Sequence, residues 1–226
     1  MADAQFVTDR GQAVVSAGTV KVLRNTYMLL SMTLLFSAAM AGVSMAINAP
    51  PMGLMSLLVM LGLLYGVHKL KNSAWGILMV FVFTGFMGFT LGPLISMYVA
   101  SGGPETVMTA LGLTGIVFFS LSGYTLVSGK DFSYMSGFLM TGLVVVFGSM
   151  LLMFFAGMFG FYVSGLHLAL SAAIVLLMSG FILYDTSRIL HGGETNYLMA
   201  TIALYLDIYN LFVSLLHLVG AFGGDD

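Results

Sequence analysis

Cysteine and charge are what this 226-residue sequence has least of. It contains no cysteine, which excludes disulfide frameworks, thiolate metal sites and cysteine nucleophiles. Only 7% of its residues are charged, whereas soluble domains carry about 25%. So few charges cannot solvate a folded surface of this size, and a soluble enzyme is excluded. The formal net charge of -2 also gives no basic surface for nucleic acid.

Apolar residues make up most of the chain. Hydrophobic side chains account for 59% of the residues, and the mean hydropathy is +1.04. The 28 glycines and 19 methionines are typical of helices that pack closely in lipid, where glycine is commoner than in soluble helices. The sequence therefore predicts an all-α integral membrane protein, surrounded by lipid.

Seven stretches are apolar enough to be transmembrane helices, which need about 20 mostly apolar residues. They cover roughly residues 26–48, 52–67, 74–99, 105–127, 133–156, 165–187 and 197–219. Segments rich in Gly, Pro, Asn or charge separate them, for example 101–104 and 191–196. We expect an N-terminal tail over 1–25, a single membrane domain over 26–219 and a short acidic tail over 220–226.

The basic residues indicate the orientation of these spans. Seven spans would place all seven Lys and Arg residues on one side of the membrane, and the positive-inside rule makes that side cytoplasmic. The N-terminus is then cytoplasmic, and the C-terminus, with Asp225 and Asp226, lies on the opposite side.

Two carboxylates stand out within the predicted spans. Asp207 is ten residues past Tyr197, or about 15 Å of helix, and no basic residue shares its span. An ionisable group at that depth costs about 2.5–3.5 kcal/mol on insertion scales, so it marks a functional site by default. Asp185 lies nearer the end of the preceding span, where an ordinary ion pair with Arg188 is an equally good interpretation.

The two aspartates belong to consecutive antiparallel spans, so stagger and tilt could bring their carboxyl groups together. Two carboxylates in contact in a low dielectric cannot both ionise cheaply, and they would share a proton. Such a pair is pH-sensitive. A divalent cation could replace the proton, and because Ca²⁺ prefers oxygen ligands, Asp185 and Asp207 are also candidates for transient Ca²⁺ binding.

A polar stripe runs along the last span from Asp207. Its other members at helical spacing are Asn210, Ser214 and His217, and the tyrosines flanking the aspartate are Tyr205 and Tyr209. Such a stripe faces the bundle interior or a water-filled path. Interhelical hydrogen bonding is the alternative, and it suits Asn210 and Ser214 better than Asp207. His217 lies near the end of the span, and we interpret it as a residue in contact with water there and not as a ligand.

The remaining sequence signals are structural or negative. Gly88 and Gly92, followed by Pro93, have the spacing of a helix-packing face, although the proline also permits a kink or hinge. The other histidines, His68, His167 and His191, lie at span ends without an i, i+4 partner to indicate a metal site. No P-loop, Ser/Lys dyad pattern or HExxH run is present. We therefore expect no catalytic residues and no cofactor.

Several segments resemble a known family. GFMGFTLGPLI (85–95), YDTSRIL (184–190) and DIYNLF (207–212) are similar to segments of the Bax inhibitor-1 family. The likeness covers essentially all seven spans. KVLRNTY (21–27) and HGGETNY (191–197) resemble its bacterial YccA-like branch, which is associated with the membrane protease FtsH in Gram-negative inner membranes.

This resemblance implies a seven-helix fold in which the last helix is surrounded by the other six. It also implies a pH-sensitive calcium leak with Asp185 and Asp207 as the latch, and with Arg188 beside them. Some members pair the first aspartate with an arginine of the second helix. The second span here has no arginine, and its basic residues are His68, Lys69 and Lys71.

Two functions are consistent with these observations. The leading hypothesis is a pH-gated cation leak in which Ca²⁺ is the transported ion. The path would run along Asp207, Asn210 and Ser214. The alternative is a modulator or substrate of FtsH in the bacterial inner membrane, engaged through residues 1–25. An intramembrane protease is a weaker third interpretation, because paired aspartates without supporting motifs are a poor signal. The oligomeric state is not indicated.

Overall fold

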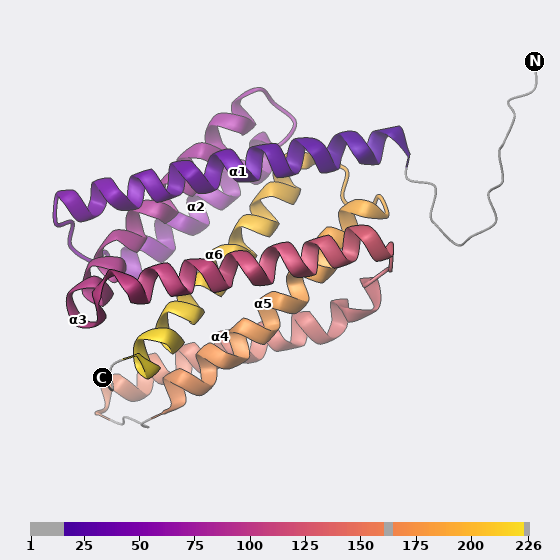
Figure 1. Cartoon of the computed structure of the whole chain (residues 1–226). Coiled ribbons are helices and arrows are strands. Elements are labelled where there is room, and N and C mark those ends of the chain that lie inside the picture. Colours follow the sequence, from indigo (N-terminus) through magenta and orange to yellow (C-terminus); the bar gives the residue numbers. More distant parts are fainter. Residues whose placement is uncertain (1–15, 161–164, 224–226) are drawn as a thin grey trace, which may run out of the picture.

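A computed structural model describes residues 16–160 and 165–223 of the chain. The first fifteen residues of the predicted N-terminal tail and the last three of the acidic tail lie outside this range. Within it the chain forms six α-helices and one 3-10 helix, and no strand occurs there (Figure 1). The elements are α1 (Ala17–Ala46), α2 (Leu54–Leu70), α3 (Trp75–Ser128), η1 (Ser133–Met135), α4 (Ser136–Met158), α5 (Leu166–Leu190) and α6 (Tyr197–Phe222).

The prediction of an all-helical membrane fold is confirmed, but the count of seven helices is not. Five of the six helices are long and apolar enough to cross a membrane. The exception is α2, whose 17 residues span about 26 Å, short of the roughly 30 Å hydrocarbon core. The third and fourth predicted spans both fall within α3, which has 54 residues.

The long helix α3 does not run straight. Gly103 lies inside it with φ 77° and ψ 169°, a non-helical conformation that favours glycine. Pro104 follows at once and supplies no N–H to continue the hydrogen-bond ladder. Figure 1 shows the two parts of α3 folding back on each other. The predicted break at 101–104 therefore exists as a sharp bend with no connecting loop, which is why one helix is counted. The backbone stays helical at Pro93.

Helix α6 is the most buried of the membrane-length helices. In its most apolar stretch 56% of the residues are buried, against 6% for the segment that contains α4. It packs against α1, α2, α3 and α5, and Figure 1 shows it crossing obliquely between α1 and the α4–α5 pair. By contrast α4 packs against α5 and η1. The helix that carries Asp207 in its middle is thus the most buried of the membrane-length helices.

Small residues set the spacing between α1 and α3. A Cβ atom added to Gly88 would overlap the backbone carbonyl oxygen of Ser37, and one added to Gly92 would overlap the side chain of Ser44. Both serines are buried in α1. Close backbone approach of this kind is the usual effect of small residues four positions apart in membrane helices.

Adding one methyl group at this contact should destabilise the fold. In Gly88→Ala the new methyl meets a backbone oxygen that cannot move aside, so we expect the free energy of unfolding to fall by about 1–3 kcal/mol. Gly112→Ala, also in α3, is the matched control because no atom lies within 4 Å of its added Cβ. Thermal unfolding in detergent, followed by circular dichroism, measures both. Equal melting temperatures for the two variants would contradict the close contact.

Candidate functional site

The α5–α6 turn fixes how the two predicted site helices lie. At the end of α5, Gly192 adopts φ 75°, and the N–H of Gly193 donates to the Arg188 carbonyl oxygen at 2.8 Å. At the start of α6, the Asn196 side chain accepts hydrogen bonds from the N–H groups of Leu198 at 3.0 Å and Met199 at 3.2 Å. Both helix ends are capped, so a short turn holds α5 and α6 antiparallel.

The same turn is fastened to the end of α2. The Asn196 amide group donates to the Lys71 carbonyl oxygen at 2.9 Å and to the Asn72 side chain at 3.0 Å. The Glu194 carboxylate accepts from the Asn196 backbone N–H at 2.9 Å. We call this end of the bundle the turn end, and the opposite end the far end.

The structure brings the two predicted aspartates together. Asp207, in the middle of α6, is only 6% exposed, and its Oδ2 atom has no hydrogen-bond donor among the described residues. The Asp185 carboxyl of α5 lies close enough to interact with it. Two ionised carboxylates cannot donate to each other. A hydrogen bond between them therefore requires a proton on one of the two.

Arg188 is paired with Glu194 and not with Asp185. Its guanidinium forms an ion pair with Glu194 at 3.3 Å, and within the described ranges no ion pair joins it to Asp185. The sequence allowed an ion pair between Asp185 and Arg188, three residues apart on one helix. In the structure Arg188 instead pairs with Glu194 of the α5–α6 turn. Because Gly192 folds the chain back, Glu194 reaches Arg188 from beyond the end of α5.

Asp185 faces a polar cavity at the turn end. The cavity has a volume of about 240 Å³, and its polar wall consists of His68, Lys71, Asp185, Arg188 and Glu194. Asp185 is partly exposed there, whereas Asp207 is buried behind it. Of the three basic residues at the end of the second predicted span, His68 and Lys71 line this cavity together with Asp185, whereas Lys69 does not.

The two tyrosines beside Asp207 have different surroundings. Tyr205 is 1% exposed; its hydroxyl is hydrogen-bonded to the Ser37 hydroxyl at 2.7 Å and donates to the Thr84 carbonyl oxygen at 3.2 Å. It therefore ties α6 to α1 and α3. The Tyr209 hydroxyl is 3.3 Å from the Thr90 hydroxyl and lines a cavity of about 440 Å³.

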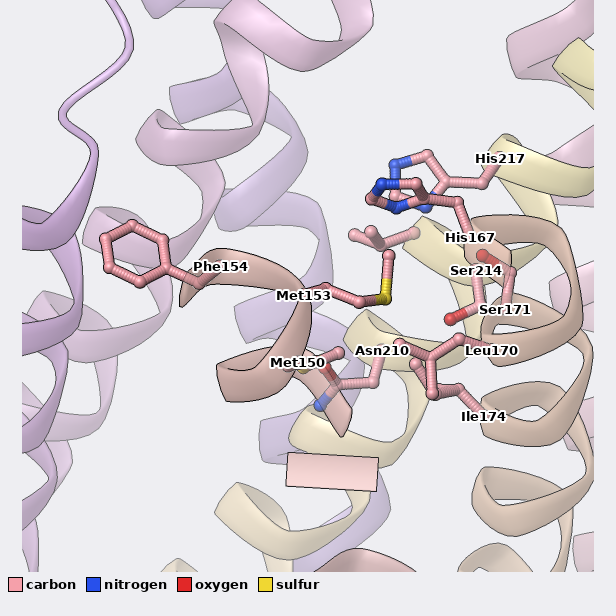
Figure 2. A pocket seen from close by; sticks show the side chains of 11 residues that line it. Met150, Met153, Phe154, His167, Leu170, Ser171, Ile174, Asn210, Ser214 and His217 are labelled. Carbon is pink, nitrogen blue, oxygen red and sulfur yellow. The ribbon is translucent and has the colours of Figure 1, made fainter. Parts of the chain in front are cut away.

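A series of cavities follows the polar stripe of α6 toward the far end. Asn210 lines both the cavity beside Tyr209 and a second one of about 320 Å³, which Ser214 and His217 also line. His217 in turn lines a third cavity, of about 340 Å³, together with Tyr98. Figure 2 shows the second cavity, with side chains of α6, α5 and α4 around it. Asn210 also donates to the Leu206 carbonyl oxygen at 2.8 Å.

Asp207 lies between these spaces and the turn-end cavity. It is in the wall of none of the four cavities. Within the part of the chain that the structure describes, no three His, Asp or Glu side chains gather as a metal site. Since Ca²⁺ takes about 6–8 oxygen ligands, the aspartate pair would need water or backbone oxygens to complete its coordination.

Sequence reasoning missed three features of this region. The first is the pairing of Arg188 with Glu194, which lies across a turn. The second is the bonding of Tyr205 to Ser37 and Thr84, which lie far away in the sequence. No local sequence pattern indicates either contact. The third is the meeting of His167 with His217, which line the same two cavities. Their similar distances from the α5–α6 turn were the available signal.

Comparison with known proteins identifies close relatives. A family model described as "Inhibitor of apoptosis-promoting Bax1" matches residues 19–224. The chain is 47% identical to "Modulator of FtsH protease YccA" of Escherichia coli over 203 residues, 89% of this chain and 90% of that protein. It is 49% identical to a membrane protein of Vibrio cholerae over 211 residues, 92% of both chains.

The relatives also bear on location and class. A second Escherichia coli relative, at 47% identity over 89% of this chain, is described as "Inner membrane protein YccA". Together with the apolar helices, these similarities confirm the predicted multi-pass protein of a bacterial inner membrane. The matches extend over nearly the whole chain, and the chain therefore belongs to the Bax inhibitor-1 family, with YccA among its relatives.

Proposed function

We propose that this protein is a pH-gated cation leak, with Ca²⁺ as the ion, in which the Asp185–Asp207 pair closes the path. The observation that supports this most is the buried Asp207 carboxyl, whose partner is a second carboxyl and not a basic residue. A structural role would be served as well by an amide or a hydroxyl. A pair of carboxyls adds sensitivity to protons, which those groups lack.

A shared proton would act as the latch. With the proton in place, the two carboxyls hold α5 against α6. When it leaves, two negative charges at about 4 Å repel by about 4 kcal/mol at an effective dielectric constant of 20. The resulting separation of α5 and α6 would join the turn-end cavity beside Asp185 to the cavities along Asn210 and Ser214.

The proposal includes seven membrane crossings, with α3 crossing twice. A straight helix of 54 residues would be about 81 Å long, far beyond the membrane thickness, and the bend at Gly103 divides it. The basic loops support a common cytoplasmic side. Lys71 contacts Asn196, and the Lys130 carbonyl oxygen accepts from Ser187 at 3.4 Å, so both loops lie at the turn end. That end would be cytoplasmic.

A second candidate function is modulation of FtsH. It is favoured by one observation, the 47% identity to a protein described as a modulator of that protease. We propose that residues 1–25 would engage the protease. The part of this tail that the structure describes begins α1, where the Ser16 side chain caps the helix by accepting from the Thr19 N–H at 3.2 Å. The two functions can be separated experimentally.

Replacing either aspartate of the pair by asparagine should remove the pH response. Asparagine keeps the hydrogen bond but cannot ionise, so Asp207→Asn and Asp185→Asn should give a low flux that does not vary with pH. The native protein should conduct more Ca²⁺ as pH rises from about 6 to about 8, because the shared proton is lost. Calcium flux into proteoliposomes measures this, and Asp131→Asn in the α3–α4 loop is the control. Native pH profiles in both pair variants would refute the latch.

Deleting residues 2–15 should separate the two candidate functions. The deletion leaves the Ser16 cap and the whole of α1 intact, so the fold should be unaffected. We expect co-purification with FtsH to be lost while pH-dependent Ca²⁺ flux persists. Loss of flux with association retained would place the tail in the leak instead. Absence of flux in both the native and truncated proteins would leave modulation as the function.

A further inference from the structure

A second pair of titratable side chains joins α5 and α6 at the far end. His167 lies in the first turn of α5 and His217 near the end of α6. Because the helices are antiparallel, these distant positions meet. Both imidazoles line the 320 Å³ cavity and the 340 Å³ cavity beyond it. His167 is exposed and His217 is partly buried, so the site opens outward from the bundle.

Sulfur from a third helix completes this site. Met150 and Met153 of α4 line the same cavity, and Figure 2 shows the Met153 side chain on the same side of the cavity as the two imidazoles. Neither imidazole has a hydrogen-bonding partner among the described residues. Histidines with a purely structural role usually hold a neighbour through a ring nitrogen, as His191 does with the Ser187 carbonyl oxygen at 2.9 Å.

The ligand types favour one class of metal ion. Two imidazoles and a thioether are soft or intermediate ligands, and thioethers select Cu(I) among biological ions. Structural zinc sites usually have four ligands that include thiolate or carboxylate, and among residues 16–160 and 165–223 no acidic side chain lines either cavity. A divalent ion would therefore keep its charge uncompensated in a largely apolar setting. A monovalent ion carries half that charge, and its desolvation is correspondingly less costly.

We propose that His167, His217 and Met153 form a binding site for a monovalent soft metal ion, Cu(I), at the far end of the bundle. The site lies between α4, α5 and α6, which meet the cavity from three sides (Figure 2). The proposal does not depend on the leak, because it uses none of the residues around the aspartate pair.

Copper binding to the purified full-length protein tests this site. Cu(I) would be titrated anaerobically in detergent against the chromophoric competitor bicinchoninate. We expect one tightly bound Cu(I) per chain, and weaker binding by about tenfold or more in His167→Gln, His217→Gln and Met153→Leu, since even outer-shell partners of a metal contribute about 10–100-fold. Met153→Leu keeps the side-chain volume and removes only the sulfur.

Matched controls separate this site from the other methionines. Met158→Leu changes an exposed methionine of the same helix that lies outside the cavity, and His68→Gln changes an exposed histidine at the turn end. Both should bind Cu(I) like the native protein, and melting temperatures check that every variant is folded. Three results would each overturn the proposal. They are equal Cu(I) affinity in Met153→Leu and Met158→Leu, equal Cu(I) affinity in His167→Gln and His68→Gln, and no tight Cu(I) binding by the native protein.

Discussion

The burial of the Asp207 carboxyl in a low-dielectric interior is the constraint on which the rest of the structure depends. Lipid offers no hydrogen bonds, so a carboxyl in the middle of a helix has to be enclosed by protein and given a partner. The arrangement meets both needs, because α6 is the most buried membrane-length helix and Asp185 approaches it from α5. Tyr205 fixes the rotation of α6 through its bonds to Ser37 and Thr84, and the close α1–α3 contact at Gly88 keeps those two partners in place.

Much of the fold could be predicted from the sequence because lipid makes hydropathy a strong signal. The predicted spans differ from the helices of the structure at positions where hydropathy carries little information. Helix α1 begins at Ala17, before its apolar stretch, because the Ser16 side chain caps it there. This first part of the helix extends beyond the lipid, so it accommodates the charged side chains of Lys21 and Arg24. At residues 101–104 the composition correctly indicated a break, but it could not show that Gly103 bends the chain without a loop.

The site could be predicted less completely because it depends on contacts between helices. Asp185 and Asp207 were identified from their cost in lipid, yet their meeting depends on a stagger that helical rise alone does not give. Arg188 looked like a partner for Asp185, and only the fold of the turn shows Glu194 in that place. The His167–His217 pair was missed because a test for i, i+4 spacing examines one helix at a time. Counting residues outward from the α5–α6 turn would have found the histidine pair, because His167 and His217 lie at similar distances from it.

The two pairs lie toward opposite ends of the same two helices, and this placement links the two proposals physically. A proton shared by Asp185 and Asp207 favours one relative position of α5 and α6. A metal ion held by His167 and His217 favours one relative position of the same helices at the far end, with α4 attached through Met153. If those positions belong to the same state, each ligand strengthens binding of the other, and if they belong to different states each weakens it, by the same factor in both directions. The far-end cavities would then influence the latch through the α5–α6 contact, without any change in the residues that form the latch.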